Sequence, residues 1–349
     1  MAFGTFSVLD TLAASQQTVA QFGEDNAFQA IDAALDAHNA IMRELLTMFA
    51  EPTTDNLRRY GGSDEMSMQE LDEYGDPNPQ KIAAGSNVGF PLRKYGLALQ
   101  WTRTAFQVMT GQEMAAAVDA AITADAKAIQ RELKRAIFKA TNATFLDRLV
   151  ANVSLPVKAF VNADSAAIPL GPNGEPFNAA THTHYLATAA FVAADLTALI
   201  ETVVEHQGAG DAQVFINRAQ EGAVRAFTGF VAYLDQRITP ATTGASAGGA
   251  LDLINFNNRA IGIYNGAEVW VKPWPVSGYI FAFVNGAPKP LAFRTRNPGG
   301  GDLSLIYENE THPLRARSFE REMGVGVYNR VNGAVLYVSG AAYVSPTIV

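Results

Sequence analysis

The longest regular pattern of apolar and polar positions in the chain lies between Thr110 and Thr141. Apolar residues recur there at spacings of three or four, which predicts one continuous stripe along an amphipathic helix. They are Met114, Val118, Ile122, Ala126, Ile129, Leu133 and Ile137. Thr110-Gly111-Gln112-Glu113 opens the segment as a capping box. About 31 residues at ~1.5 Å each make a rod of roughly 45 Å, which is long for a globular protein.

A second stripe of the same kind runs from Phe28 to Phe49 and predicts the first helix of the chain. Asp25 or Asn26 is expected to cap this helix, and Pro52 is expected to end it. The stripe also contains His38, which we interpret as a packed structural histidine rather than a ligand.

Residues 53–109 form a long excursion between these two helices. Its first part is polar and acidic and is interrupted by Gly61-Gly62 and Pro77-Asn78-Pro79, which predicts a solvated loop. The ligand spacing of a calcium loop is absent. Period-two alternation from Tyr95 to Trp101 predicts a half-buried strand. Such a ribbon is marginal in water alone, and nothing else in the sequence is assigned to its apolar side, so we expect a neighbouring chain to cover it.

The second half of the chain alternates between strand and helix patterns. We predict a strand at 157–161, a helix at about 186–206, a strand at 212–217, a helix through 223–230, and strands at 261–273, 278–285 and 290–296. Residues 239–250 are a low-complexity loop. Asn332-Gly333 separates two apolar runs and predicts a two-residue hairpin.

Composition restricts the function classes. Of the 349 residues, 48% are hydrophobic and only 17% are charged, against a usual charged share of about 25%. We therefore expect a large core and some apolar surface hidden against other chains. The net charge of −8 argues against a nucleic-acid-binding surface. The lack of cysteine excludes disulfides, thiolate zinc sites and cysteine nucleophiles, and no signal-peptide or membrane-spanning pattern is present.

One motif suggests catalysis. The segment 244–248, Gly-Ala-Ser-Ala-Gly, matches the nucleophile elbow of α/β-hydrolases, and Ser246, then Asp252 or Asp302, then His312 follow the order of that triad. The elbow needs a buried strand before it and a helix after it, whereas this motif lies in the low-complexity loop. A serine hydrolase using Ser246 is therefore kept only as a distant alternative.

Two further groups of residues were weighed as binding sites. His182 and His184 lie on one face of an expected strand and could offer two imidazoles to a metal. The only further candidate ligands, Glu201, Glu205 and His206, are distant in sequence, so we favour a structural role. Four arginines with interleaved glutamates are expected to form solvated or inter-chain salt bridges; these are Arg315, Arg317, Arg321 and Arg330 with Glu320 and Glu322. We predict no catalytic residue, no cofactor and no metal site.

Taken in order, these elements resemble the major capsid protein fold of tailed bacteriophages, which encapsulin shells share. The residue-level similarities are Phe90-Pro91-Leu92, His182-Thr183-His184-Tyr185-Leu186, Val214 to Asn217, and Phe319-Glu320-Arg321-Glu322-Met323-Gly324. The resemblance implies an α+β fold. It divides the chain into an N-terminal arm and helix (1–52), an extended loop (53–109), a spine helix and peripheral domain (110–180), an axial α/β domain (181–311) and peripheral return strands (312–349).

The resemblance also implies a function without catalysis. A structural virion protein would self-assemble into the hexamers and pentamers of an icosahedral phage head around double-stranded DNA. Its partners would be other copies of itself, portal, scaffolding and decoration proteins, and DNA bound without sequence specificity; a membrane is not implied. It would be made in the host bacterial cytoplasm and reside in the virion. Only about 25 residues precede the first helix, so we expect scaffolding to be a separate protein. An encapsulin-like compartment is the alternative.

In this family the extended loop overlaps a neighbouring subunit, and some members cross-link it there, with Lys81 as our candidate participant. We predict inter-subunit contacts through Tyr74, Lys81, Phe90, Arg93, Tyr95, Leu97 and Trp101.

Overall fold

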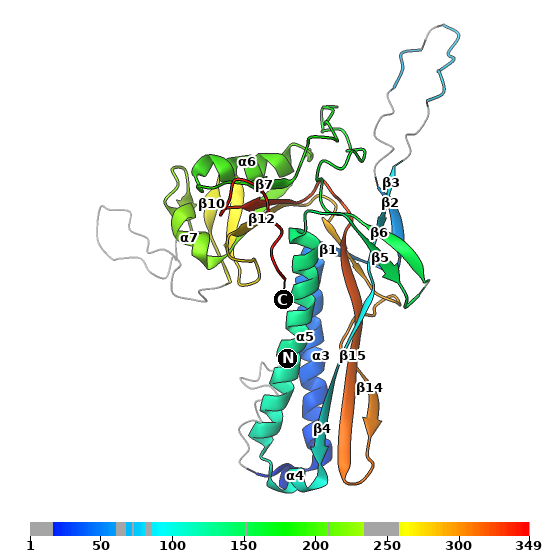
Figure 1. Cartoon of the computed structure of the whole chain (residues 1–349), viewed down its shortest axis with the longest axis vertical. Coiled ribbons are helices and arrows are strands. Elements are labelled where there is room, and N and C mark those ends of the chain that lie inside the picture. The colour runs from blue at the N-terminus through cyan, green and yellow to red at the C-terminus, as the bar shows by residue number, and fades with distance from the viewer. Residues whose placement is uncertain are drawn as a thin grey trace, which may run out of the picture.

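The computed structural model describes residues 17–60, 68–71, 73–80, 85–150, 152–208, 210–233 and 258–348. Two long helices and two sheets dominate the described part (Figure 1). Helices α3 (Glu24–Phe49) and α5 (Gly111–Phe138) run side by side along a narrow sheet, and a second sheet with its own helices lies at one end of them (Figure 1).

Helix α5 confirms the predicted long helix. The Thr110 hydroxyl accepts from the Glu113 amide at 3.3 Å, and the Glu113 carboxylate accepts from the Thr110 amide at 2.9 Å, which completes the capping box. Most of the predicted stripe is buried, including Met114, Val118 and Ile129. Propensity, capping and burial therefore favour the same element.

Helix α3 is also confirmed, but both of its ends differ from the prediction. Its N-cap is Gly23, with φ at 98°, rather than Asp25 or Asn26. It ends at Phe49, before Pro52 is reached, because strand β1 (Ala50–Thr53) begins at once and pairs in parallel with strand β13 (Leu291–Arg294). Pro52 lies within this edge strand, where a residue without an amide hydrogen is tolerated.

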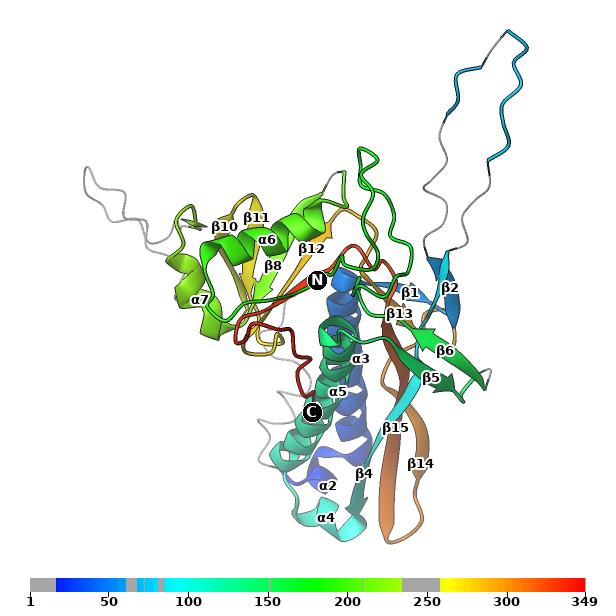
Figure 2. The same cartoon turned by 45° about the horizontal axis from the view of Figure 1, so that its top comes forward.

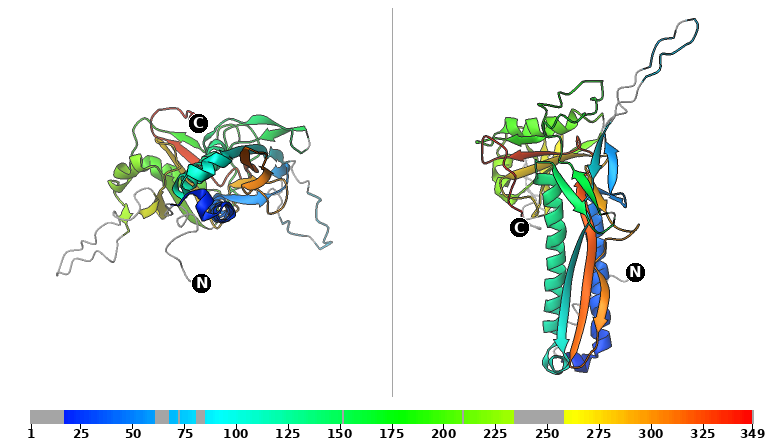
Figure 3. Two further views of the ribbon diagram at one scale, coloured as in Figure 1. Left: turned by 90° about the horizontal axis from the view of Figure 1, so that it is seen from below. Right: turned by 45° about the vertical axis from the view of Figure 1, so that its right-hand side comes forward.

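The narrow sheet is built around strand β15 (Leu314–Val327). Its order is β1-β13-β15-β14, with β14 at Ser304–Asn309, and strand β4 (Arg93–Thr102) also pairs with β15. The β4–β15 register runs over ten residues, from Leu314 opposite Thr102 to Met323 opposite Arg93. Figure 3 shows α5 standing along this pair of strands. Helix α4 (Arg103–Val108), which was not predicted, closes the turn from β4 to α5, and α2 (Val19–Phe22) packs against it.

The second sheet has seven strands (Figure 2). Its order is β7 (Tyr185–Ala187), β16 (Ala334–Tyr337), β12 (Tyr279–Asn285), β8 (Asp211–Ile216), β11 (Ala267–Val271), β10 (Arg259–Tyr264) and β9 (Val231–Ala232). Helices α6 (Ala193–Val204) and α7 (Arg218–Arg225) pack against it through Leu196, Leu199 and Val224. On its other side, Phe215 and Phe281 meet Phe49 at the end of α3, which joins the sheet to the long helices.

Several sequence predictions differ from the structure in this region. Helix α6 begins at Ala193, after strand β7, rather than at about 186, and α7 ends at Arg225 rather than near 230. The run 261–273 is a hairpin of two strands, because Asn265 and Gly266 both take positive φ, 46° and 79°, and turn the chain. Asn332-Gly333 is not a hairpin: β15 and β16 belong to different sheets. The Asn332 side chain is buried and bonds both backbone groups of Val284, so it anchors a crossover between sheets instead.

Two small hairpins complete the described fold. Strands β2 (Leu57–Tyr60) and β3 (Ser86–Gly89) pair at the base of the excursion, and β5 (Ala143–Asp147) pairs with β6 (Val153–Val157). The strand expected at 157–161 was wrong, because β6 ends at Val157 and residues 158–161 are irregular. The sheets also cross the predicted domain boundaries, because β13 and β14 join the narrow sheet and β16 joins the seven-stranded sheet.

Candidate functional site

The residues considered for a serine hydrolase are not assembled by the described structure. Ser246 and Asp252 lie outside the described residues. Asp302 accepts a hydrogen bond from Arg43 Nε at 3.0 Å, and His312 is exposed just before β15. Of the two described candidates, Asp302 is thus paired with Arg43, and His312 lies at the surface.

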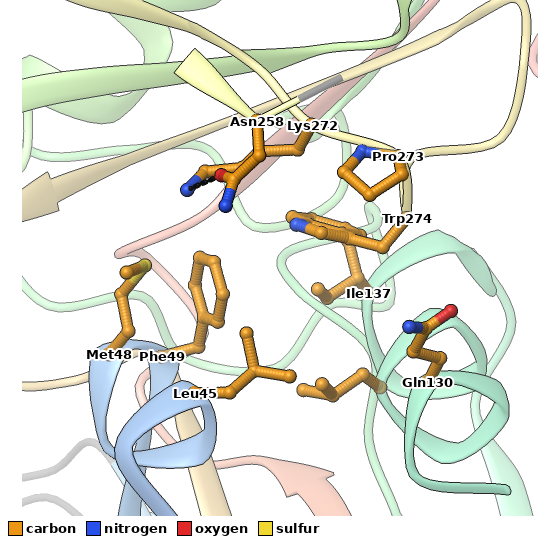
Figure 4. Close-up of a pocket in the computed structure, with 10 residues that line it drawn as sticks. Leu45, Met48, Phe49, Gln130, Ile137, Asn258, Lys272, Pro273 and Trp274 are labelled. Carbon is orange, nitrogen blue, oxygen red and sulfur yellow. Dashed lines mark hydrogen bonds between the residues drawn. The ribbon is translucent and has the colours of Figure 1, made fainter. Parts of the chain in front are cut away.

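An apolar cavity of about 130 Å³ lies where α3, α5 and the turn after β11 meet (Figure 4). Phe49, Leu133 and Trp274 line it together with Lys272 and Asn258, which are hydrogen-bonded to each other at 2.7 Å. The described lining holds no carboxylate, imidazole or hydroxyl group. We interpret the cavity as a packing gap rather than a catalytic pocket.

The tip of the excursion, of which the structure describes residues 68–71 and 73–80, lies far from both sheets, beyond the β2–β3 hairpin (Figures 1 and 2). It carries large apolar side chains that the subunit does not cover: Met68 is fully exposed, Tyr74 is 83% exposed, and Leu71 is about half exposed. Lys81 lies outside the described residues. Exposed apolar groups gathered on one projecting segment are typical of a contact surface for another chain.

The apolar side of the return limb of the excursion is covered by the same subunit, whereas a neighbouring chain was expected to cover it. Phe90 is fully buried against Val88 and Ala292. Trp101 is also buried, with its ring 6.2 Å from that of Phe28. Helix α3 and strand β13, both distant in sequence from the residues that they cover, supply this cover, which no local pattern could reveal.

The other predicted contact residues of β4 also engage their own subunit. The Tyr95 hydroxyl donates to Glu132 Oε1 at 2.6 Å, and Arg93 Nε lies 3.3 Å from Glu132 Oε2. Leu97 is half-buried and packs against the cluster between the long helices and the sheet. Of the described residues in the predicted contact set, Tyr74 has by far the most exposed side chain.

A second apolar surface, missed by the sequence analysis, lies on strand β14. Leu305, Ile306 and Tyr307 follow one another and are all exposed, with exposed fractions of 39%, 51% and 57%. β14 ends the order of its sheet, so no strand among the described residues pairs with its outer edge. An exposed apolar edge strand favours association with another chain unless it is protected.

The expected solvated arginine run is largely buried within the chain. Arg321 donates through Nε and Nη2 to Asp125 on α5, both at 2.8 Å, and His38 Nε2 lies 2.7 Å from the same carboxylate. Arg330 is buried as well and pairs with Asp164 at 3.1 Å. The Asp125 cluster joins α3, α5 and β15, which confirms the structural role assigned to His38. The Arg330–Asp164 pair joins the segment after β15 to the connection after β6.

The Asp125 network also sets the protonation state of its carboxyl group. Burial by itself raises the pKa of Asp125, but hydrogen bonds and charge from His38 and Arg321 outweigh it, so the pKa lies below its ordinary value. Asp125 is therefore ionised at neutral pH and balances the buried guanidinium.

Three histidines meet beside the seven-stranded sheet. His182 and His184 precede β7, and His206 follows α6. Their Nε2 atoms lie 3.2 Å (182–184), 2.9 Å (182–206) and 3.1 Å (184–206) apart. Glu205 Oε1 is 3.4 Å from the nitrogen of His182 and 3.7 Å from that of His206. His206 and Glu205 are distant in sequence from the histidine pair, but the fold places both beside it; Glu201 is not part of the cluster.

The surroundings of these imidazoles keep them neutral at pH 7. Burial lowers the pKa of His184 well below 6.5 and, with the charge of His182, lowers the pKa of His206 to about 4. Burial also lowers the pKa of His182. His184 Nδ1 lies 2.8 Å from the Gly333 carbonyl oxygen, which can only accept, so Nδ1 carries the hydrogen and Nε2 presents its lone pair to the cluster.

Comparison with known proteins addresses the fold. No family model and no curated protein sequence matches the chain. A chain in the solved structure of Mycobacterium phage Patience is 22% identical, with a TM-score of 0.67 over 91% of this chain and 89% of that one. The mature capsid of bacteriophage PhiM1 (10% identity, TM-score 0.47, 84% and 85% covered) and the SrpI encapsulin complex of Synechococcus elongatus (12%, 0.42, 87% and 90%) are more remote.

We assign the fold from the Patience comparison alone, because its TM-score of 0.67 is well above those of the other two structures. The chain has the tailed-phage major capsid fold, which encapsulins share, as the order of its elements predicted. No helix among the described residues is both long and apolar enough to cross a lipid bilayer.

Proposed function

We propose that this chain is a capsid shell subunit that assembles into the hexamers and pentamers of a tailed-phage head around double-stranded DNA. The observation that carries the proposal is the shared fold, which extends over 91% of this chain and 89% of the Patience phage chain.

The described surfaces suit a mechanical role. Paired helices α3 and α5 on the β4–β15 ladder make a stiff body, tied by buried ion pairs such as Arg321 with Asp125. Two apolar surfaces are exposed: the tip of the excursion, with Tyr74, projects beyond the β2–β3 hairpin, and the β14 edge, with Ile306, runs along one side of the narrow sheet (Figures 1 and 3). Because these surfaces differ from each other, contacts between copies would be heterologous, and heterologous contacts that close generate rings.

The remaining partners follow from the proposed shell. Portal and scaffolding proteins, and decoration proteins where present, would bind the assembled form, and the subunit would be made in the host bacterial cytoplasm and end in the virion. A net charge of −8 suits a shell that encloses DNA without binding it tightly. An encapsulin-like compartment uses the same fold and would differ in its content, which would be protein cargo instead of DNA.

The test is the size and content of the expressed protein. Sedimentation velocity and negative-stain images should show closed shells of megadalton mass, and particles from infected cells should contain nuclease-protected DNA. A chain that sediments as a monomer or dimer under all assembly conditions would contradict the proposal. Shells that contain only a protein cargo would favour the encapsulin-like alternative.

A matched pair of variants tests the β14 edge. Ile306→Lys places a charge on the exposed edge strand and should abolish shells, while the circular dichroism spectrum of the subunit stays unchanged. Ile263→Lys makes the same change at another exposed isoleucine, on β10 of the other sheet, and should assemble. Shells of normal yield from Ile306→Lys would exclude this edge as an assembly contact.

A further inference from the structure

The histidine cluster beside β7 is the strongest unassigned constellation in the described residues, and its chemistry is independent of the proposed shell. It combines three imidazoles and one carboxylate whose candidate ligand atoms all lie within 4.8 Å of one another. Surface acidic clusters often arise without a ligand, but three imidazole nitrogens converging on one point need a physical reason.

Hydrogen bonding alone does not satisfy the three nitrogens. His184 Nε2 carries no hydrogen, because Nδ1 donates to the Gly333 carbonyl. At most two hydrogens are then available, on His182 and His206, for three mutual contacts of 2.9–3.2 Å. At least one close pair therefore remains without a hydrogen bond, whereas one cation would satisfy all three lone pairs together.

The distances correspond to those of a metal centre. Two nitrogens bound at about 2.0–2.1 Å and near the tetrahedral angle lie about 3.3 Å apart, slightly more than the observed separations. An ion at that bond length would lie about 1 Å out of the plane of the three nitrogens. We propose that His182, His184 and His206 bind a divalent transition-metal ion of the zinc type, with Glu205 as the fourth ligand.

The surroundings supply what such a centre requires. The hydrogen bond from His184 to Gly333 fixes the tautomer that offers Nε2, as backbone carbonyls commonly do for metal-bound histidines. The Phe177 ring packs on His206 with ring centroids 4.0 Å apart and walls off one side. Glu205 and His182 keep 40% and 18% of their side chains exposed, which leaves a path for an ion to enter.

The bound ion would stabilise the long connection between β6 and β7. Residues 158–184 lead from β6 to β7 with little regular structure, and His182 and His184 close that stretch. His206 and Glu205 belong to the end of α6, on a different segment. Coordination would join the two segments across the sheet edge, which is the role of a structural zinc site.

The experiment measures metal content and geometry directly. Purified protein is stripped with a chelator, dialysed against Zn²⁺ or Co²⁺, and analysed by elemental mass spectrometry and visible absorption. We expect about one Zn²⁺ per chain and the intense visible bands of tetrahedral Co²⁺. His182→Ala and His206→Ala should each lose the bound ion and these bands. His312→Ala, which removes an exposed histidine outside the cluster, should retain both.

Folding is monitored on the same samples. Because His182 is partly exposed, its alanine variant should keep the circular dichroism spectrum and the metal-free melting temperature of the parent, so a lost ion is not a sign of unfolding. Zn²⁺ should raise the melting temperature of the parent and of His312→Ala only. Absence of bound metal from a natively folded parent, or equal binding by all three histidine variants, would overturn the proposal.

Discussion

Removing the buried carboxylate with Asp125→Ala should lower the free energy of unfolding by about 3–5 kcal/mol. The side chain of Asp125 is 2% exposed and that of its partner Arg321 is 1% exposed. Without the carboxylate, Arg321 keeps hydrogen bonds to Asn39 and the Gly301 carbonyl, but neither carries a charge. A buried cation without a counter-charge is far more costly than a lost surface contact.

The exposure of an ion pair decides how much its loss lowers the free energy of unfolding. The Arg43–Asp302 pair has a similar separation, 3.0 Å, but 60% of the arginine side chain is exposed, so a surface value of about 0–1 kcal/mol is expected there. The matched control is Asp119→Ala, an exposed aspartate on the same helix α5, whose substitution should change stability by no more than about 0.5 kcal/mol.

The assay is denaturant unfolding of the unassembled subunit, followed by circular dichroism and tryptophan fluorescence. Asp125→Ala should shift the midpoint with little change in slope, because the surface exposed on unfolding stays similar. The double variant Asp125→Leu/Arg321→Met should recover much of the loss, since it removes both charges. A loss below about 1 kcal/mol in Asp125→Ala would refute the argument, because the pair would then behave as a surface contact.

Four further predictions concern the long helix, the excursion, a close backbone approach and the effect of acid. Ile129→Asp places a charge in the fully buried stripe of α5 and should yield insoluble or unassembled protein, whereas normal particles would show that the stripe does not face a core. Replacing residues 62–84 with a short Gly/Ser linker, which keeps β2 and β3, should preserve circular dichroism and cooperative melting but abolish shells in sedimentation; shells that still form would exclude the excursion as an assembly contact. Gly324→Ala would put a methyl group 1.7 Å from a backbone oxygen and should lower the melting temperature strongly, while Gly222→Ala, with open space around it, should raise stability by about 0.4–1 kcal/mol. Finally, the pKa of Asp125 is held below its usual 3.8, so its stabilising contribution is complete above that pH and is lost as pH falls through the folded-state pKa; melting temperature should drop steeply on acidification below about pH 4, and less steeply in Asp125→Ala.

Periodic features of this chain could be predicted from its sequence, because they are local. The stripe of α5, its capping box at Thr110 and the alternation in β4 each depend on neighbours within a few residues. The order of these elements was sufficient to identify the capsid fold. Asn332-Gly333 shows the limit of this reasoning, since a local turn signal was overruled by the different sheets that its two flanks join.

The candidate sites depend on contacts that no local pattern encodes. Asp125 looks like a solvated helix residue until Arg321, almost two hundred positions later, is placed against it. His206 became a neighbour of His182 only through the path of α6. Three of the five histidines in the chain lie between positions 182 and 206, and this was the available sequence signal for the cluster. The separation of His206 from the other two concealed it.

The central position of β15 has a consequence for biosynthesis. Its partner strand β4 precedes it by roughly two hundred residues, and the two are joined over ten positions. During translation at about 5–20 residues per second, α3, α5 and β4 leave the ribosome many seconds before the strand that covers them exists. Their apolar faces are open during that interval, and neighbouring nascent chains expose the same faces. We therefore expect newly made subunits to require a chaperone until β15 has been synthesised, and chaperone depletion to cause aggregation before any shell can form.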